Sequence, residues 1–350
     1  MTERMFDAAI VGAGPAGATV AHRLAQAGAN VVVFDHSHPR EKPCGGGISA
    51  RARTMFPELD ELAALGKSGT RLRLVSPAGR VTVVEGGGNT FAIDRAILDA
   101  QLLARAVDAG ARHEAQKVLA VEKQADGWRV TTSAGAVRAK TLIGADGVFS
   151  PVRRALLGPI PRAHLAFGAH ALVERLDPPS ALLQFFGDRR GYAWIFNRKE
   201  KSSLGVGMPD ARKGDWRVLL QRLINEQAPG HSPSIRGWLL PQASSEAAFA
   251  AKLGGDDWCV IGDAAGHVDP FTGEGILYAM WGARIAAECL QSGGLSPYDA
   301  RWREEFLPRL LKHLKISALL ERKYLLETVL AAGRLPLVGA WLYGALTSAD

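Results

Sequence analysis

Glycines at positions 12, 14 and 17 have the spacing GxGxxG, within the run Gly12-Ala13-Gly14-Pro15-Ala16-Gly17. Glycines at this spacing let a backbone approach a pyrophosphate closely, and the N–H groups of a following helix attract its negative charge. Asp35 lies about 20 residues further on, where a carboxylate can accept hydrogen bonds from ribose hydroxyls. The spacing alone is weak evidence, because glycine-rich turns also occur without a ligand.

The elements around this run are those that a dinucleotide site requires. Residues 8–11 are a fully apolar run, as in a buried parallel strand. Residues 18–27 are rich in Ala and Leu and predict a helix that Gly28 ends, and residues 29–34 predict a second strand. Because strand, glycine turn, helix and strand form a βαβ unit, we expect residues 7–35 to bind a dinucleotide.

Two later aspartates also follow apolar strands. Asp146 lies in the run Gly144–Ser150, which Arg153 and Arg154 follow, and Asp263 lies in the run Gly262–His267. Each carboxylate is expected at the carboxyl edge of the sheet, where open α/β sheets bind ligands. One aspartate after a strand commonly caps a turn, but three in the same position on one chain predict a shared nucleotide site.

These two later segments resemble the second and third signatures of flavoproteins of the p-hydroxybenzoate hydroxylase type. The resemblance implies that the cofactor is FAD, with the aspartate of the third signature on its ribityl chain. The sequence has no second GxGxxG between a strand and a helix, so we expect no separate nicotinamide domain. Electrons are then expected from a transiently docked NAD(P)H or from a protein donor.

Four further segments resemble the geranylgeranyl reductase family. They are Lys42–Ser49 (KPCGGGIS), Ile93–Asp99 (IDRAILD), Asp269–Ile276 (DPFTGEGI) and Tyr192–Asn197 (YAWIFN). The last matches a lipid-pocket motif in part, with Arg189 and Asn197 where the family has prolines. Together with the FAD segments, the resemblance implies a set of cofactor-binding residues: Gly12, Gly14, Pro15, Ala16, Gly17, Asp35, Arg40, Cys44, Gly45, Gly46, Arg95, Asp146, Gly262, Asp263, Pro270, Gly273, Gly275 and Ile276.

The same resemblance implies roles for four side chains beyond FAD binding. Tyr192, Trp194 and Phe196 alternate along a predicted strand and share one of its faces, where they line either a substrate cavity or an ordinary core. Cys44 is the candidate catalytic proton donor, and its alternative role is that of a small packing residue.

The reaction that the resemblance implies is saturation of carbon–carbon double bonds in a hydrophobic, isoprenoid-like substrate of the geranylgeranyl type, by hydride transfer from reduced flavin. An FAD-dependent monooxygenase or halogenase-like enzyme acting on a hydrophobic or aromatic small molecule is the alternative, because a fold does not fix the chemistry. A flavin-binding electron carrier fits less well, since its substrate-type domain would have no purpose. Saturation adds hydrogen to the product, whereas oxygenation adds oxygen.

Composition bears on partners and location. The net charge of +7 suits anionic ligands or an anionic membrane surface, and no basic block with interleaved aromatics predicts nucleic-acid binding. Cys44, Cys259 and Cys289 have neither disulfide-framework nor metal-site spacing, so we expect no metal.

Without a signal-peptide pattern, a cytoplasmic location is expected. A basic amphipathic helix at 302–330 either lies peripherally on a membrane or packs on the protein.

The expected fold is α/β. It combines a Rossmann-type FAD-binding domain with an inserted, mostly antiparallel β-sheet substrate domain and C-terminal helices. The expected FAD-binding domain is discontinuous and comprises residues 1–70, 89–162 and 251–295. Residues 71–88 and 163–250 are expected to form the substrate domain, and residues 296–350 the C-terminal helical region.

Overall fold

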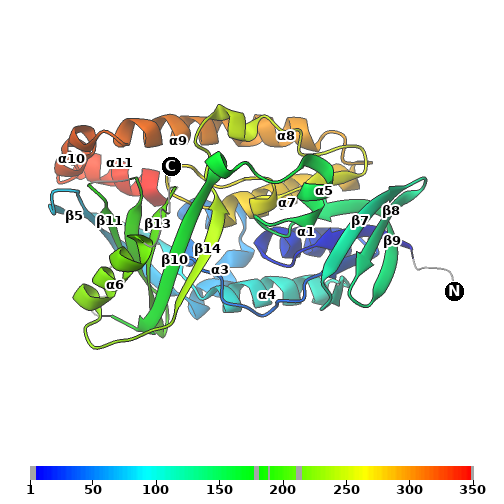
Figure 1. The fold of residues 1–350 in the computed structure, drawn as a ribbon, viewed down its shortest axis with the longest axis horizontal. Coiled ribbons are helices and arrows are strands. Elements are labelled where there is room, and N and C mark those ends of the chain that lie inside the picture. Colours follow the sequence, from blue (N-terminus) through cyan, green and yellow to red (C-terminus); the bar gives the residue numbers. More distant parts are fainter. Residues whose placement is uncertain (1–4, 177–180, 188–189, 210–214, 348–350) are drawn as a thin grey trace. The chain divides into compact units, whose positions relative to one another are not determined.

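The computed structural model describes residues 5–176, 181–187, 190–209 and 215–347, so Arg189 lies outside the described residues. The chain forms two compact units. The first comprises Met1–Arg40, Leu98–His164 and Pro241–Leu314, and the second comprises Glu41–Ile97, Leu165–Leu240 and Lys315–Asp350. Both combine helices with a sheet, so the α/β fold class is confirmed (Figure 1).

The first unit is built on a seven-stranded sheet with the order β6-β2-β1-β9-β8-β7, in which β15 also pairs with β9. β1 is parallel to β2 and β9, and β15 is parallel to β9. All of β2 and the last four residues of β1 are buried, as expected of apolar parallel strands covered on both faces. The strands are β1 (Met5–Val11), β2 (Val31–Phe34), β6 (Arg112–Glu114), β7 (Val118–Gln124), β8 (Gly127–Thr132), β9 (Gly135–Gly144) and β15 (Trp258–Val260).

Helices α1 (Pro15–Gln26) and α7 (Ile276–Gln291) of the first unit pack against each other. The predicted helix at 302–330 is instead divided among α8 (Tyr298–Glu305), α9 (Leu307–Leu320) and α10 (Lys323–Ala332). Its apolar stripe is buried: Phe306 and Leu310 are 0% exposed and Leu314 is 9% exposed. The packing alternative is therefore confirmed for this stripe, because its side chains are buried in the protein and do not lie on a membrane surface. Helix α5 (Pro151–Leu157) also lies in this unit, and α4 (Arg95–Asp108) begins in the second unit and continues into the first.

The second unit is built on an eight-stranded sheet with the order β14-β10-β13-β12-β11-β4-β5-β3. The pairs β10–β13, β13–β12, β12–β11, β4–β5 and β5–β3 are antiparallel, whereas β11 is parallel to β4. The strands are β3 (Gly47–Ile48), β4 (Lys67–Val75), β5 (Val81–Ala92), β10 (Leu165–Glu174), β11 (Ala181–Phe185), β12 (Tyr192–Asn197), β13 (Lys201–Met208) and β14 (Ile235–Pro241), and two short helices, α2 (Ala50–Met55) and α3 (Glu58–Leu62), follow β3. Because β4 and β5 continue this sheet, residues 41–70 and 89–97 fall in the second unit and not in the first.

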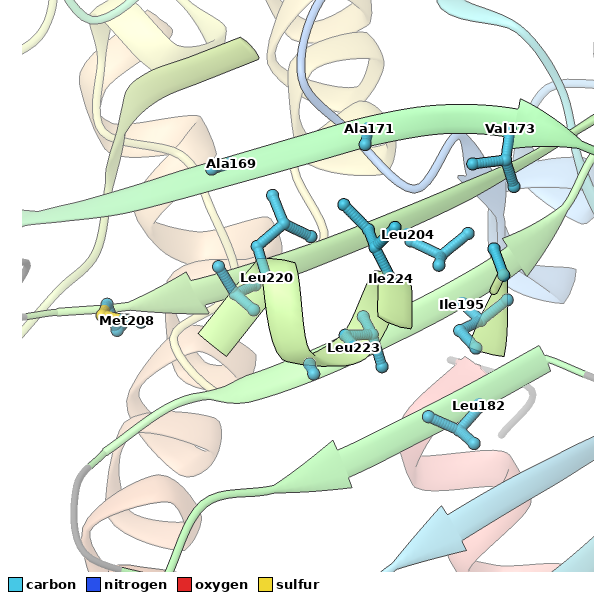
Figure 2. Close-up of a cluster of buried hydrophobic side chains, with 13 residues drawn as sticks. Ala169, Ala171, Val173, Leu182, Ile195, Leu204, Met208, Leu220, Leu223 and Ile224 are labelled. Atoms are coloured by element: carbon cyan, nitrogen blue, oxygen red, sulfur yellow. The ribbon is translucent and has the colours of Figure 1, made fainter. Parts of the chain in front are cut away.

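Helices cover both faces of this second sheet. Figure 2 shows Leu220, Leu223 and Ile224 of α6 (Asp215–Gln227) pointing into one face, among side chains that include Ile195 of β12. Since neighbouring residues of a strand face opposite ways, Trp194 lies on the other face, where α10 and α11 (Pro336–Thr347) pack. Residues 315–347 therefore belong to the second unit.

Candidate functional site

The GxGxxG turn connects β1 to α1 and excludes side chains at two of its glycines. Gly12 has a φ of +98°, and a Cβ on it would lie 2.4 Å from the carbonyl oxygen of Ala145. A Cβ on Gly17 would lie 1.8 Å from the carbonyl oxygen of Gly12. Gly14 differs, because a Cβ there meets no atom of the described residues within 4 Å, its two chain neighbours aside.

Gly14 is also the N-cap of α1, and Pro15 follows it in the first turn. No described side chain caps this helix. The first N–H groups of an α-helix have no partner within the helix and carry the positive end of its dipole. The open space at Gly14 is thus a place where a phosphate would be bound by backbone N–H groups.

Asp35 follows β2 and lies against this turn. Its Oδ2 accepts a hydrogen bond from the Ala13 N–H over 2.9 Å, and its Oδ1 accepts one from the Ser37 N–H over 2.8 Å. His38 Nδ1 and Arg40 Nη1 each lie 3.2 Å from Oδ2. Burial alone would raise the pKa of Asp35, but the hydrogen bonds from His38, Ser37 and Ala13 outweigh it and hold the pKa well below its usual range. The carboxylate is therefore a charged acceptor beside the glycine turn.

Backbone hydrogen bonds bring the three aspartate-bearing segments to one edge of the first sheet. The Ala145 N–H donates to the carbonyl oxygen of Val11 over 2.7 Å, and the Ile261 N–H donates to that of Gly144 over 2.8 Å. Arg153 of α5 also donates from Nη1 to the carbonyl oxygen of Ala264 over 3.0 Å. The second and third segments therefore follow the same strand ends as the GxGxxG turn, as the sequence predicts.

Asp146, in the second segment, has a buried oxygen that the described residues do not use. The Val152 N–H donates to Oδ2 over 3.4 Å, whereas Oδ1 is buried with no hydrogen-bond partner among the described residues. Burial raises the pKa of Asp146 to about 6, against the opposing effect of a hydrogen bond from Ser150. A buried unpaired acceptor is unfavourable, so this oxygen is suited to a ligand that donates a hydrogen bond.

The third segment lies against the starts of both α1 and α7. Gly262 has a φ of +61°, and a Cβ on it would lie 3.0 Å from the Cβ of Ala16. Asp263 Oδ1 lies 3.5 Å from the position of a Cβ on Gly275, which is the N-cap of α7. No described side chain caps α7, and its first residue, Ile276, is buried. A second helix N-terminus with uncapped N–H groups therefore lies beside Asp263.

The loop before α7 is held by Asp269, whose role the sequence did not indicate. Its Oδ1 accepts hydrogen bonds from the Phe271 and Thr272 N–H groups, each over 2.9 Å. Tyr278 OH donates to Oδ2 over 3.1 Å, and His313 Nδ1 lies 2.5 Å from the same oxygen. Pro270 is buried in this loop, and Gly273 has a φ of +73°. His313 lies far along the chain, and no sequence motif marks it.

In the second unit, Cys44–Gly46 form a tight loop against β12. A Cβ on Gly45 would lie 2.6 Å from the ring of Phe196, and a Cβ on Gly46, whose φ is +76°, would lie 2.1 Å from the carbonyl oxygen of Ile93. Cys44 is half-buried, and its Sγ accepts a hydrogen bond from the Gly46 N–H over 3.2 Å. Only glycines allow this close approach of the loop to an aromatic ring.

A buried arginine fixes the same loop. Arg198 is 0% exposed and donates to Glu41 over 2.7 Å, to Asp94 over 2.6 Å and to the carbonyl oxygen of Cys44 over 2.8 Å. Ser203 Oγ donates to the same carbonyl oxygen over 3.1 Å. Arg95, the predicted flavin contact in this segment, is buried at the start of α4. No sequence motif marks Arg198 or Ser203, although Arg198 directly follows the YAWIFN segment.

The aromatic residues of β12 share one face of the sheet, as predicted. Trp194 is 8% exposed and belongs to a buried apolar cluster with side chains of α10 and α11, whereas Tyr192 and Phe196 are only partly buried at its margin. The rings of Tyr192 and Trp194 are 6.2 Å apart. Through Phe196 this aromatic face reaches the Cys44–Gly46 loop. Asn197 stands where the family motif has its last proline. Its side chain is buried, and its Oδ1 accepts a hydrogen bond from Ser202 Oγ.

These features of the first unit fit FAD. Two uncapped helix N-termini can bind anionic groups, an ionised carboxylate stands beside the glycine turn, and a buried carboxylate oxygen needs a donor. Each matches a part of the cofactor: pyrophosphate, ribose hydroxyls, ribityl hydroxyls and flavin carbonyl. No group of three or more His, Cys, Asp or Glu side chains among the described residues is arranged to hold a metal ion.

Comparison with known proteins identifies the family. Residues 5–291 match a family model described as an FAD binding domain. The chain is 32% identical to geranylgeranyl diphosphate reductase of Rhodobacter capsulatus, over 91% of this chain and 84% of the relative. It is 28% identical to digeranylgeranylglycerophospholipid reductase of Methanocaldococcus jannaschii, over 91% of this chain and 87% of the relative.

A crystal structure of a geranylgeranyl bacteriochlorophyll reductase-like protein from Thermoplasma acidophilum has the same fold. It superposes with a TM-score of 0.81 at 21% identity and covers 99% of this chain and 97% of its own. The family model, the relatives and the FAD-compatible geometry agree with one another. The chain is an FAD-dependent oxidoreductase that belongs to the geranylgeranyl reductase family.

Proposed function

We propose that the protein reduces carbon–carbon double bonds in the isoprenoid chain of a hydrophobic substrate. Family membership carries this proposal, because the names of both relatives specify reductases of molecules that contain geranylgeranyl chains. The head groups in those names differ, a diphosphate in one and a glycerophospholipid in the other. The shared prenyl chain is therefore the part of the substrate that we assign to this protein.

The residues of the first unit bind and orient the cofactor in this proposal. The N-terminus of α1, with Gly14 open at its cap, binds the pyrophosphate. Asp35 accepts from the ribose, and Asp146 and Asp263 accept from the ribityl hydroxyls, which would pair the unused oxygen of Asp146. The uncapped N–H groups at Gly275 and Ile276 stabilise negative charge on the pyrimidine end of the ring, as an oxyanion site does.

When bound, FAD supplies the two-electron chemistry of the reaction, a hydride for one carbon of the double bond. The second carbon needs a proton, and we propose that Cys44 holds it at Sγ. The family's KPCGGG segment, by resemblance, lies beside the flavin ring. The Gly46 N–H, 3.2 Å from Sγ, would stabilise the thiolate that remains.

The aromatic face of β12 is proposed to exclude water from the substrate chain. Tyr192 and Phe196 are only partly buried, so each has surface to offer an apolar chain at the edge of the cluster around Trp194. Apolar side chains orient a prenyl chain by shape, which is the contribution that a protein makes when its cofactor supplies the chemistry. A lipid substrate also implies contact with a membrane surface.

The electron source is proposed to be NAD(P)H that docks transiently, or a protein donor. A monooxygenase or halogenase-like reaction stays the alternative, since related folds support several flavin chemistries. Family membership favours reduction over this alternative.

An anaerobic single-turnover experiment tests the proposal. The flavin is reduced photochemically, a lipid with a geranylgeranyl chain is added in detergent, and the extracted product is analysed by mass spectrometry. We expect reoxidation of the flavin together with a gain of two hydrogens for each reduced bond. The proposal would be contradicted if the lipid stayed unchanged under nitrogen and an oxygenated product formed after O₂ was admitted. That result would support the monooxygenase alternative.

A further inference from the structure

Large apolar side chains are exposed unusually often near the C-terminus of the second unit. Among the described residues, thirteen large hydrophobic side chains are exposed, and five of them lie between positions 319 and 341. Single exposed leucines are normal in soluble proteins, but such a concentration calls for an explanation. The five are Leu319 (52% exposed), Tyr324 (87%), Leu335 (61%), Leu337 (88%) and Trp341 (56%).

Helix α11, which carries Leu337 and Trp341, is apolar on two faces, and Tyr324 lies near the start of α10. Leu326 and Leu330 of α10 and Leu342 and Tyr343 of α11 are buried in the cluster around Trp194. Leu337 and Trp341, four residues apart and therefore neighbours on the surface of α11, face away from it. Packing on the sheet thus explains one face of α11 and leaves its other apolar face without a described partner.

Basic side chains accompany the exposed apolar ones. Arg322, Lys323 and Arg334 are exposed; Lys323 directly precedes Tyr324, and Arg334 directly precedes Leu335. The two acidic residues of this region are already engaged, since Glu321 pairs with Arg190 and Glu327 accepts from the Ala78 N–H over 2.6 Å. Exposed Leu, Trp and Tyr side chains beside Lys and Arg are typical of helices that lie in the interface of an anionic bilayer.

The alternatives to surface contact fit less well. No single helix among the described residues is long and apolar enough to cross a bilayer, and α10 passes that test only when joined to Leu337–Leu346, which is bent from it by 120°. A stable contact with a second copy would involve about 20–30 residues on each side. Five apolar side chains interspersed with cations make a poor core for such an interface.

We propose that α10 and α11 dock on the surface of an anionic lipid bilayer, inserting Leu335, Leu337 and Trp341 into its interface. The buried faces of the same two helices form the cluster that contains Trp194 and reaches Tyr192 and Phe196. In the docked protein, the exposed side of α10 and α11 would contact the bilayer. Their buried side packs on the face of β12 that we propose to contact the substrate. This consequence rests on the proposed function, whereas docking itself does not.

Sedimentation with sucrose-loaded vesicles tests docking without any substrate. The FAD-loaded protein is mixed with vesicles of phosphatidylcholine alone, or of phosphatidylcholine with phosphatidylglycerol. We expect binding to the anionic vesicles that weakens with salt. A Leu337→Glu, Trp341→Glu double variant should lose tenfold or more in affinity, because roughly two buried apolar side chains are removed from the interface. Val218→Glu on α6, a residue 70% exposed, is the matched control and should bind like wild type.

A second variant separates the electrostatic part of docking. Arg322→Gln with Lys323→Gln should weaken binding to anionic vesicles by about fivefold per cation and leave any binding to phosphatidylcholine unchanged. Absence of wild-type binding, or equal binding by the Glu variant, overturns the proposal. A wild-type dimer in sedimentation velocity that the Glu variant abolishes, without vesicle binding, assigns the surface to a second copy instead. Because no turnover is measured, failure of the proposed reaction leaves these results unaffected.

Discussion

Arg198 donates a hydrogen bond to the carbonyl oxygen of Cys44 over 2.8 Å, across 154 residues of sequence. The guanidinium is fully buried and also engages Glu41 and Asp94, so one side chain joins the loop around the proposed proton donor to the residue before α4. A buried charge is stable only when it is paired and hydrogen-bonded. Arg198 therefore fixes the backbone of the loop that carries Cys44.

Arg198→Gln should lower the free energy of unfolding by about 3–5 kcal/mol, because it leaves the mostly buried carboxylates of Glu41 and Asp94, which are 14% and 18% exposed, without their counter-charge. Urea unfolding followed by circular dichroism measures this loss. Arg71→Gln is the matched control, since Arg71 and Glu85 form an ion pair in which both side chains are 65% exposed. The control should lose less than about 1 kcal/mol. Equal losses in the two variants would show that the Arg198 pairs are solvated.

Cys44→Ala should leave FAD binding intact and slow the alkene-dependent reoxidation of reduced flavin by about 10²–10⁴-fold, the usual contribution of a general acid. Anaerobic stopped-flow absorbance at the flavin band measures this rate. Cys44→Ser, which keeps an O–H of higher pKa, should also be slow. Rates within a few-fold of wild type in both variants would leave Cys44 with only its packing role.

The sequence predicts the first unit better than the second for a physical reason. A pyrophosphate site is built from contiguous residues, so Gly12, Gly14 and Gly17 show their purpose through spacing alone. The structure confirms that Gly12 and Gly17 admit no side chain and that Gly14 faces open space. Asp146 and Asp263 are recognised in the same way, because each follows directly on its strand.

Contacts between distant segments leave no such local pattern. Nothing next to Arg198 predicts that it meets Glu41 and Cys44, and the pairing of Asp269 with His313 joins a loop to a helix 44 residues away. The single helix expected at 302–330 shows the same limit. Its periodicity is correct, but the breaks after Glu305 and Leu320 depend on tertiary packing.

Gly14→Val and Gly17→Val should both prevent FAD binding, but only Gly17→Val should disrupt the fold. A Cβ at position 14 meets no described atom within 4 Å, its two chain neighbours aside, so the Gly14→Val apoprotein should fold normally but fail to bind FAD where the phosphate belongs. Valine at position 17 would collide with the carbonyl oxygen of Gly12 and should unfold the protein. Thermal unfolding of the apoproteins and flavin absorbance after reconstitution distinguish the two outcomes. A Gly14→Val protein that binds FAD normally contradicts the assignment of the pyrophosphate site.

Asp146 should give the apoprotein a pH-dependent stability that FAD suppresses. Burial raises the pKa of this carboxyl to about 6 in the folded chain, whereas about 3.9 is usual when unfolded. Between these values the unfolded chain is ionised and the folded chain is protonated, so stability falls as pH rises from about 4 to about 6. The full loss of stability, about 3 kcal/mol for a pKa raised by about two units, is present above about pH 6 and absent below about pH 4.

The measurement is the difference in unfolding free energy between wild-type and Asp146→Asn apoproteins, from urea titrations between about pH 4 and pH 8. Asparagine does not titrate, so the variant should gain stability relative to wild type as pH rises. His170 and His267, whose pKa values burial lowers to about 4 and about 3, affect both proteins alike and cancel in the difference. With FAD bound, a donor on Oδ1 would favour the charged carboxylate and flatten the curve. A difference that stays constant with pH in the apoprotein would mean that water reaches this carboxylate and that its pKa is not raised in the folded chain.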